Sequence, residues 1–392
     1  MQTARRYLAR EIYRSTSVVL IALLGLFTFF TLVDELDTVS ARFSLTALFY
    51  LQGLSLPTRL YDLLPIGLLI GAILALSGLA QRNELAILRV SGVSGMGLLG
   101  MLWTVSIPII LGALILSEFL TPLAEIKSSE VNLLMRGRVE GGRLASGYWF
   151  KEPTPNGGMR VVNVGKLLTS GNVENLSIYE FPDGLTLSVM TQAKSGKFVK
   201  GKLDMQDVVE THLAADIKSV LADAKVTGKP AATVKQLPQQ TIDTTLSSER
   251  LVARILTPER MSLVALNDYI DYLNSNQLQA DRQIVAVWRK MAYPFTLLVM
   301  LTIAAPISFM QTRRGGVGAK VFLGILLGTG FFMINQLALN VSLLFKWPPV
   351  VTALLPNIVA MILALTAVFL MENRNALAQR KGRFFFWKKS VL

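Results

Sequence analysis

Long apolar stretches separated by shorter charged segments are the main pattern along this chain. Six of them, approximately residues 15–33, 61–80, 98–120, 293–309, 321–344 and 350–371, are long enough to cross a hydrocarbon core as helices. Prolines fall in or at the ends of several stretches, where neighbouring helices can satisfy the freed backbone groups. These are Pro65, Pro108, Pro294, Pro306 and Pro356. The pattern predicts a polytopic α-helical membrane protein with six transmembrane helices, some of them kinked.

A polar segment, residues 121–283, interrupts this pattern between the third and fourth apolar stretches. It contains short runs rich in β-branched and aromatic residues, separated by turn-forming sequences such as 155–158, 182–184 and 195–196. The runs cover residues 147–151, 160–164, 176–181, 185–193, 197–202 and 207–213, and they end by about residue 235. This spacing favours an all-β domain, either a sandwich or an open barrel. Residues 262–274 carry apolar residues at helical spacing and predict a helix that leads back to the membrane region.

These patterns divide the chain into four parts. Residues 1–120 hold the first three transmembrane helices and a short amphipathic helix at about 81–92. Residues 121–283 form the β domain with its flanking connectors, and residues 284–371 hold the last three transmembrane helices. Residues 372–392 form a basic tail with an aromatic cluster at 384–387.

The distribution of charge predicts which way the protein faces. The net charge is +13, which by itself is compatible with binding to nucleic acid or to anionic lipid. However, fifteen Lys and Arg against three acids fall in four segments that a model of six helices places on one side: the N-terminal arm, residues 81–97, residues 311–320 and the tail. Basic residues concentrate on the cytoplasmic side of membrane proteins. We therefore expect both termini in the cytoplasm, the β domain outside, and no nucleic-acid partner.

Few residues are suited to catalysis or metal binding. The chain has no cysteine and one histidine, His212, which lies in a strand-like run and is interpreted as an ordinary sheet residue. No GxxxxGK[ST] phosphate-binding loop occurs, so the chain is not expected to hydrolyse ATP by that route. We expect no catalytic residue, no metal site and no cofactor bound by this chain.

The segment between the second and third apolar stretches is a candidate contact with a partner. Its sequence, Leu-Ala-Gln-Arg-Asn-Glu-Leu-Ala-Ile-Leu-Arg-Val-Ser-Gly-Val-Ser at 79–94, predicts a short charged amphipathic helix held between two membrane helices. Such a helix is suited to a groove on a soluble partner. The alternative is a solvated loop whose apolar residues lie on the bilayer surface.

Here the sequence resembles the LptF/LptG (YjgP/YjgQ) family, the permease subunits of the lipopolysaccharide export ABC transporter. The resemblance extends over nearly the whole chain. It rests on Arg-Tyr-Leu-Ala-Arg-Glu at 6–11, Asp-Leu-Leu-Pro at 62–65, the large β insertion and the three closing spans. Asn83-Glu84-Leu85 with Ser91-Gly92 is similar to the motif by which the family contacts its ATPase. Trp347-Pro348-Pro349 followed by Ala-Leu-Leu-Pro at 353–356 is more similar to G than to F subunits.

The resemblance implies a fold, a set of partners and a transport function. The inserted domain would be a periplasmic, β-jellyroll-like domain in a multi-pass protein of a Gram-negative inner membrane. The partners would be an LptF-like permease in a heterodimer, a cytoplasmic LptB-like ATPase dimer that uses ATP and Mg, a single-span LptC-like protein and an LptA-like periplasmic bridge. The substrate would be lipopolysaccharide, taken from the membrane and passed to that bridge.

The resemblance also implies two groups of site residues. The ATPase-coupling group comprises Arg82, Asn83, Glu84, Leu85, Leu88, Arg89, Ser91 and Gly92, and reversing the charge of Glu84 is expected to uncouple export. Some G subunits carry a lysine on the first helix, where this chain has Thr31. The candidate lipid-contact group comprises Thr31, Lys127, Arg136, Arg138, Phe331, Phe332 and Gln336. Solvated charges and plain helix packing are the alternatives for this second group.

Three other functions stay open at this point. The chain could be a membrane-anchored periplasmic binding or scaffold protein, although one span would suffice for that. It could be a permease for another anionic lipid. An intramembrane enzyme is disfavoured because ionisable pairs are missing from the spans, where Glu118 is the main acid, near a helix end.

Overall fold

The structure is a computed structural model that describes residues 2–39, 43–136, 148–154, 157–167, 172–183, 186–199, 201–213, 232–246, 257–276, 278–309 and 316–372. It divides into two compact units. The first comprises Met1–Asp37, Ser55–Thr121 and Asp281–Leu392, and the second comprises Thr38–Leu54 and Pro122–Ala280. The aromatic and basic residues of the tail lie outside the described residues.

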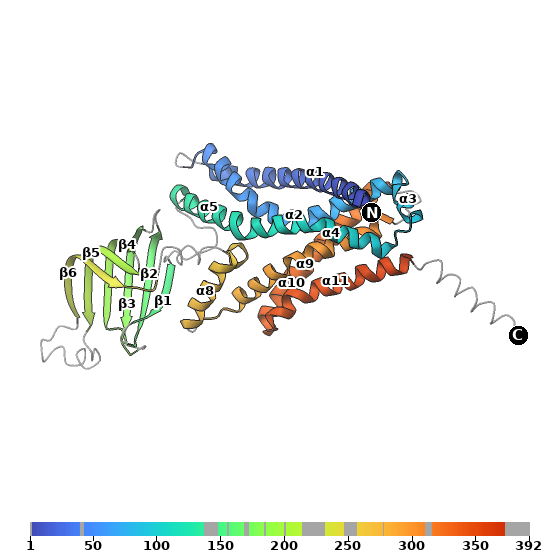
Figure 1. Cartoon of the computed structure of the whole chain (residues 1–392). Helices are drawn as coiled ribbons and strands as arrows, with labels where there is room; N and C mark the ends of the chain where they lie inside the picture. The colour runs from blue at the N-terminus through green and yellow to red at the C-terminus, as the bar shows by residue number, and fades with distance from the viewer. Residues whose placement is uncertain are drawn as a thin grey trace, which may run out of the picture. The chain divides into compact units, whose positions relative to one another are not determined.

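Among the described residues, six helices are long and apolar enough to cross a membrane, which confirms the predicted helical membrane fold. They are α1 (Gln2–Glu35), α2 (Leu45–Gln81), α4 (Gly95–Ile115), α9 (Asp281–Phe309), α10 (Val317–Phe345) and α11 (Pro349–Glu372) (Figure 1). Several start well before the apolar windows: α2 begins at Leu45 and α9 at Asp281, because a hydropathy window detects only the apolar part of a helix. A π-helical turn, η2 (Leu116–Leu120), continues α4 into α5 (Thr121–Arg136).

Polar side chains within the first unit join neighbouring helices. The Tyr13 hydroxyl of α1 donates to the Val105 carbonyl of α4 at 2.7 Å. The Trp103 indole of α4 donates to the Thr302 hydroxyl of α9 at 3.0 Å. Polar groups in an apolar environment need such partners, so these bonds help to specify which helices are neighbours. The central helix is α2, which is mostly buried, whereas α1 and α10 expose much of their apolar surface.

Glycines allow α2 to approach its neighbours closely. A Cβ at Gly71 would lie 2.5 Å from the Cα of Thr16 in α1, and a Cβ at Gly324 of α10 would lie 2.4 Å from Cδ1 of Ile73. Small residues at helix crossings are a common means of association in membranes, where water does not drive apolar packing. The α1–α2 crossing at Gly71 is therefore a close backbone contact.

We predict that Gly71→Ala weakens the α1–α2 crossing. The added methyl group would meet backbone atoms, which cannot rotate away, so a loss of about 1–3 kcal/mol is expected. A lower melting temperature of the detergent-solubilised protein would report it. Gly78→Ala, in the same helix with nothing within 4 Å of the added Cβ, is the matched control. Equal melting temperatures for the two variants would contradict the prediction.

The second unit contains the expected antiparallel β domain. The described part of this unit has six strands: β1 (Tyr148–Pro153), β2 (Met159–Leu167), β3 (Asn172–Phe181), β4 (Val189–Val199), β5 (Lys202–Leu213) and β6 (Ala232–Asp243). Each strand pairs with the next in sequence, so these strands form a meander with β1 and β6 at its edges (Figure 1). The interior is packed, and Val162, Leu176, Met205 and other apolar side chains are at most 1% exposed.

Three details of the predicted strand pattern are wrong. The run at 197–202 is not one strand, because β4 ends at Val199 and β5 begins at Lys202. Ser195-Gly196 is not a turn but lies within β4, where Gly196 pairs with Met205 of β5. A Cβ at Gly196 would lie 2.6 Å from Cδ1 of Leu176, so the glycine makes room for core packing. The strands also do not end by residue 235, because β6 runs to Asp243. This strand is largely exposed and contains Pro238, which is tolerated at a sheet edge.

A row of irregular positions crosses the sheet. Asn175 of β3 and Asp207 of β5 have φ of 55° and 52°, and no pairing joins Asn175 to Lys194 or Asp207 to Pro238. On either side of this row, buried positions are three residues apart rather than two, as in Val173 and Leu176 or Met205 and Val208. The alternation of these strands therefore shifts by one residue at the row, with no extra residue in either partner. Neighbouring strands undergo the same shift in alternation, so their backbone pairing continues on the far side of the row.

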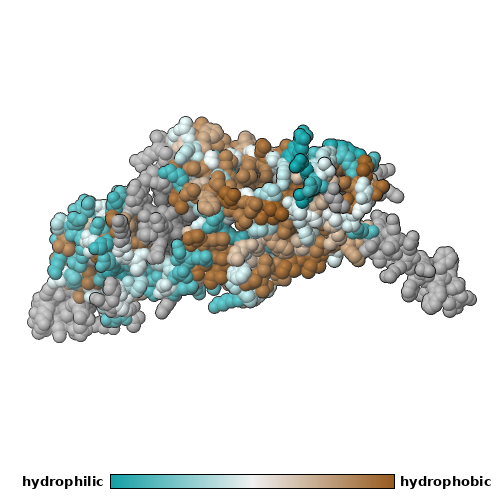
Figure 2. All heavy atoms as spheres, viewed as in Figure 1, coloured by the Kyte–Doolittle hydropathy of each residue, from teal (hydrophilic) through white to brown (hydrophobic). Residues whose placement is uncertain are grey.

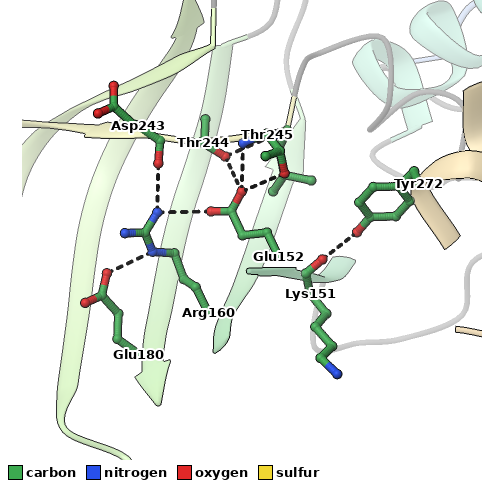
Figure 3. A network of polar contacts seen from close by, with 9 residues as sticks. Lys151, Glu152, Arg160, Glu180, Asp243, Thr244, Thr245 and Tyr272 are labelled. Atoms are coloured by element: carbon green, nitrogen blue, oxygen red, sulfur yellow. Dashed lines mark hydrogen bonds and ion pairs between the residues drawn. The ribbon is translucent and has the colours of Figure 1, made fainter. Parts of the chain in front are cut away.

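A buried polar network joins the two edges of the sheet at one end (Figure 3). Arg160 of β2 donates to Glu152 at 3.1 Å, to Glu180 at 2.8 Å and to the Asp243 carbonyl at 2.8 Å. Glu152 of β1 also accepts from Thr244 at 2.7 Å and from the Thr245 amide at 2.9 Å. Since these threonines directly follow β6, the first and last strands meet here, as in an open barrel.

Helix α8 (Leu263–Ser275) is positioned within the same unit. The helix lies where the sequence predicts one, after a short 3₁₀ turn, η4 (Pro258–Arg260). The hydroxyl of Ser262 accepts from the Ala265 amide and caps it. The Tyr272 hydroxyl donates to the Lys151 carbonyl of β1 at 2.9 Å (Figure 3). The guanidinium of Arg260 lies 3.1 Å from Glu125 of α5. These contacts join α5, α8 and the sheet.

Candidate functional site

A short helix, α3 (Glu84–Val90), lies between α2 and α4 where the coupling segment is predicted. Asn83 separates α2 from α3 with φ of 59°, a conformation that asparagine tolerates better than most residues. At the other end, Gly92 has φ of 89°, which favours glycine, and the Ser94 hydroxyl caps α4 by accepting from the Gly97 amide. The sequence therefore specifies a short helix, with a residue of positive φ interrupting the helical backbone before it and another after it.

Contacts with α1 and α11 hold this segment in place. Arg82 Nη2 lies 3.4 Å from Glu11 Oε1 of α1, and Arg82 Nη1 lies 3.9 Å from Glu84 Oε1. The Tyr7 hydroxyl of α1 is within hydrogen-bonding reach of the Glu84 carboxylate. On the other side, Glu372 at the end of α11 accepts from the Gly95 amide at 3.0 Å, where the helix dipole of α4 favours a negative charge. A displacement of α3 would therefore act on both helices.

The two faces of α3 differ in their surroundings. Leu85 is buried, and Leu88 packs against the apolar core of the first unit. Ile87 and Val90 point away from that core and are 62% and 90% exposed. Sequence reasoning missed these two residues, because α3 carries apolar side chains on both faces and the pattern does not show which face is buried. An exposed apolar pair on a short helix is suited to a partner surface.

The other residues of the predicted coupling group have varied roles. Arg82 and Asn83 are exposed, and Glu84 is half-buried. The Ser91 hydroxyl donates to the Ile87 carbonyl at 2.9 Å and so completes the end of α3, while Gly92 forms the turn. The side chain of Arg89 lies outside the described residues. The structure thus brings the group into one segment but leaves only part of it available to a partner.

A long groove begins at this segment. It has a volume of about 2290 Å³ and is lined by the end of α2, by α3, and by facing sides of α9, α10 and α11. Asn83, Leu85 and Ala86 line one end, and Trp347, at the far end of α10, lines the other. Apolar side chains also cover much of the visible surface of these helices (Figure 2). The coupling segment is therefore part of the groove wall.

The predicted lipid-contact residues belong to both units and lie in part outside the described residues. Phe331 lines the groove, whereas Phe332 and Gln336 are exposed on another face of α10. The hydroxyl of Thr31 donates to the Phe27 carbonyl of its own helix at 2.8 Å. Lys127 is exposed on α5, the side chain of Arg136 is not described, and Arg138 lies outside the described residues. Among the members of this group whose side chains are described, Phe331 is the one that lines the groove.

The described residues include no group of three His, Asp or Glu side chains that could hold a metal ion. His212 lies at the end of β5, with Nε2 3.3 Å from a carboxylate oxygen of Glu210. This is a single pair on an interior strand, which pairs with β4 on one side and β6 on the other. The described geometry offers an apolar groove and, on α3, an exposed apolar pair.

Comparison with known proteins agrees with this architecture. A family model described as lipopolysaccharide export system permease LptF/LptG matches residues 6–371. The chain is 27% identical to lipopolysaccharide export system permease protein LptG of Escherichia coli (strain K12), over 90% of this chain and 94% of that protein. It is 22% identical to the protein of the same name from Haemophilus influenzae, over 93% of this chain and 97% of that protein. The chain belongs to the LptF/LptG family of lipopolysaccharide export system permeases.

Proposed function

We propose that this chain is the G-type permease subunit that takes lipopolysaccharide from the membrane and delivers it for export. The curated relatives are named LptG, and the match extends over almost their whole length. The observation that carries the mechanism is the groove whose wall includes α3, because a partner that moves α3 would change the space available to a lipid. The chain itself acts as a non-catalytic subunit.

The charge distribution supports a defined orientation. Basic residues predominate in the N-terminal arm, in the segment around α3 and in the tail, and these parts would face the cytoplasm. The β domain would then lie in the periplasm of a Gram-negative bacterium. In this orientation α3 is accessible to a cytoplasmic protein, while the β domain is accessible to the periplasmic proteins of the export system.

The proposed partners account for what the chain lacks. An LptB-like ATPase dimer would bind α3 through Ile87 and Val90 and would use ATP and Mg, since this chain has no phosphate-binding loop. An LptF-like permease would cover the exposed apolar faces of α1 and α10. An LptC-like single-span protein and an LptA-like bridge would receive lipopolysaccharide on the periplasmic side.

Reconstitution of the complex tests this function. The chain is purified with its co-expressed partners, placed in vesicles that contain lipopolysaccharide, and mixed with a soluble LptA-like acceptor. We expect ATP-dependent transfer of lipopolysaccharide to the acceptor, and no transfer with a non-hydrolysable nucleotide. Transfer of phospholipid instead would favour a permease for another anionic lipid, and recovery of the chain without any ATPase would favour a scaffold.

A further inference from the structure

The groove along α9, α10 and α11 is polar at one end and apolar over the rest of its length. Among the described residues that line it, those with polar or charged side chains, other than Trp347 at the far end, are Gln81, Asn83, Ser308, Lys320 and Glu372. They lie at the ends of α2, α9 and α11 and in the first turn of α10. The other described lining residues are apolar or glycine. A lipid with its polar head at these residues would match this distribution.

Lys320 lies at the end of the groove that α3 helps to form. A Cβ at Gly328 of α10 would lie 3.3 Å from Cδ2 of Leu69 in α2. A Cβ at Gly324 would lie 2.4 Å from Cδ1 of Ile73, so the two helices run antiparallel. Lys320 comes one turn before Gly324 and is therefore level with the last turns of α2, which lead into α3.

The size of the groove fits acyl chains better than a small soluble molecule. Its volume of about 2290 Å³ is well above the roughly 300–1,000 Å³ of typical small-molecule sites. Along α10, the lining extends from Lys320 to beyond Val341, which is about 30 Å at 1.5 Å per residue. That length is comparable to the hydrocarbon core of a bilayer. The apolar part of the groove is thus suited to chains that run along the helices.

The Lys320 ammonium can bind a phosphate group. It donates to the Ser308 carbonyl at 2.6 Å, and among the described residues it forms no ion pair. Capping the end of α9 in this way uses one of its three N–H donors, and the others can bind phosphate oxygens. Basic pockets between transmembrane helices bind lipid head groups. The nearby carboxylate of Glu372 accepts from the Gly95 amide at 3.0 Å, where the dipole of α4 offsets its negative charge.

The position of this charge decides which lipid fits. In the proposed orientation the α3 end faces the cytoplasm, so a lipid with its head at Lys320 belongs to the cytoplasmic leaflet. Its chains need only about half of the groove, because one leaflet provides half of a core of about 30 Å. A lipid delivered to the periplasmic side would have its head near Trp347, where no described lining residue is charged. The α3 end is therefore arranged for a different lipid from the transported one.

We propose that the α3 end of the groove binds a glycerophospholipid of the cytoplasmic leaflet, with its phosphate on Lys320 and its acyl chains between α10 and α11. The bound phospholipid contacts the coupling segment at Asn83 and occupies the groove beside α3. Assignment to the cytoplasmic leaflet rests on the orientation proposed above, whereas binding at this site does not require that the chain transport lipopolysaccharide.

Photo-crosslinking in the complete complex locates the phospholipid. Photoreactive p-benzoylphenylalanine replaces either Leu326, which lines the groove and is 55% exposed, or Phe322, which is 67% exposed on α10 and does not line it. Leu326 lies about 9 Å beyond Lys320 along the helix, at the level of the acyl chains. The complex is reconstituted in vesicles of phosphatidylethanolamine and phosphatidylglycerol with a labelled fraction, extracted, washed with detergent and irradiated. We expect labelled phospholipid to be captured at position 326 and to be washed away from position 322.

Three further changes assign the capture to this site. Lys320→Met should lower capture at position 326 about tenfold, because a hydrogen bond to a charged group is lost, whereas Lys320→Arg should keep about half or more. Lys346→Met is the matched control, since Lys346 is exposed at the other end of α10 and does not line the groove. It should not alter capture. Ala367→Phe, on the groove-lining face of α11, should lower capture by filling the space while leaving Lys320 in place.

Several results would overturn the proposal. Equal capture at positions 326 and 322 after washing, or unchanged capture in Lys320→Met, would exclude a headgroup site at Lys320. Capture of labelled lipopolysaccharide at position 326 in place of phospholipid would make this end part of the transport path. If Lys320→Met is not recovered as a folded complex, Ala367→Phe decides, and wild-type capture in that variant would exclude the groove. Failure of the complex to transfer lipopolysaccharide would count against the proposed function but not against this site.

Discussion

Replacement of Arg160 by methionine is expected to destabilise the β domain by about 3–5 kcal/mol, the cost of leaving a buried charge without its partner. Glu152 is 1% exposed, and Arg160 is the cation that pairs with it. Without Arg160, the Asp243 carbonyl also loses a donor, so the contact between the two ends of the sheet is weakened.

Hydrogen exchange in the full-length protein measures this effect strand by strand. If the domain opens cooperatively, a loss of about 3–5 kcal/mol accelerates exchange in β1, β2 and β6 on the order of a hundred- to several-thousand-fold. Exchange in α2 and α9 should stay unchanged, because these helices belong to the other unit for most of their length.

The exposed pair of Lys194 and Asp207 in the same sheet provides the control. Its atoms are 3.9 Å apart and the side chains are 80% and 72% exposed, so Lys194→Met should cost at most about 1 kcal/mol. A second comparison is Arg160→Met combined with Glu152→Met, which removes both buried charges and should recover part of the stability. If Arg160→Met exchanges no faster than Lys194→Met, the network does not hold the sheet closed.

The membrane helices could be predicted from sequence because their signal is local. A run of apolar residues must form a helix in lipid, whatever its neighbours are. The extensions of α2 and α9 were missed, since those turns are amphipathic and depend on tertiary contacts. Similarly, β6 has both faces largely exposed and contains Pro238, so neither alternation nor strand propensity identifies it.

The polar contacts of the structure are less accessible to sequence analysis. Glu152, Arg160 and Thr244 lie in separate parts of the chain, and nothing in their local sequence distinguishes them from solvated residues. Gly196 looks like a turn residue until Leu176 is seen to fill the space above it. The Ser117 carbonyl in the π turn accepts a hydrogen bond from Lys290, which is far away in sequence. Each of these features depends on distant residues that only the fold brings together.

The candidate site could be predicted from the sequence only in part. The motif at 83–92 placed the coupling segment in the chain, and the structure places it against α1 and α11. The sequence does not show which residues of α3 are exposed to a partner, because Leu85 and Leu88 form one apolar stripe of the helix and Ile87 and Val90 form another. The two stripes suggest separate tests of binding and of coupling.

For coupling, Glu84→Lys is expected to leave the ATPase bound but to lower lipopolysaccharide transfer per ATP. The carboxylate of Glu84 faces Arg82 and Tyr7, so a lysine there would repel Arg82 and loosen α3 from α1. Glu84→Gln, which keeps the size and avoids the repulsion, should be milder. A Glu84→Lys complex with full transfer and full ATPase binding would show that this residue does not couple α3 to α1.

For binding, Ile87→Asp combined with Val90→Asp is expected to abolish retention of the ATPase. Burial of each apolar side chain contributes up to about 1.5–3 kcal/mol, and a carboxylate forced into the same interface adds a desolvation cost. A combined loss of at least roughly 3 kcal/mol weakens the complex more than 100-fold, which co-purification and titration of the ATPase can measure. Ile87→Val, which keeps an apolar surface, should bind nearly normally. Since neither Ile87 nor Val90 packs in the core, the melting temperature of the permease should not change, and retained ATPase would place the contact elsewhere on α3.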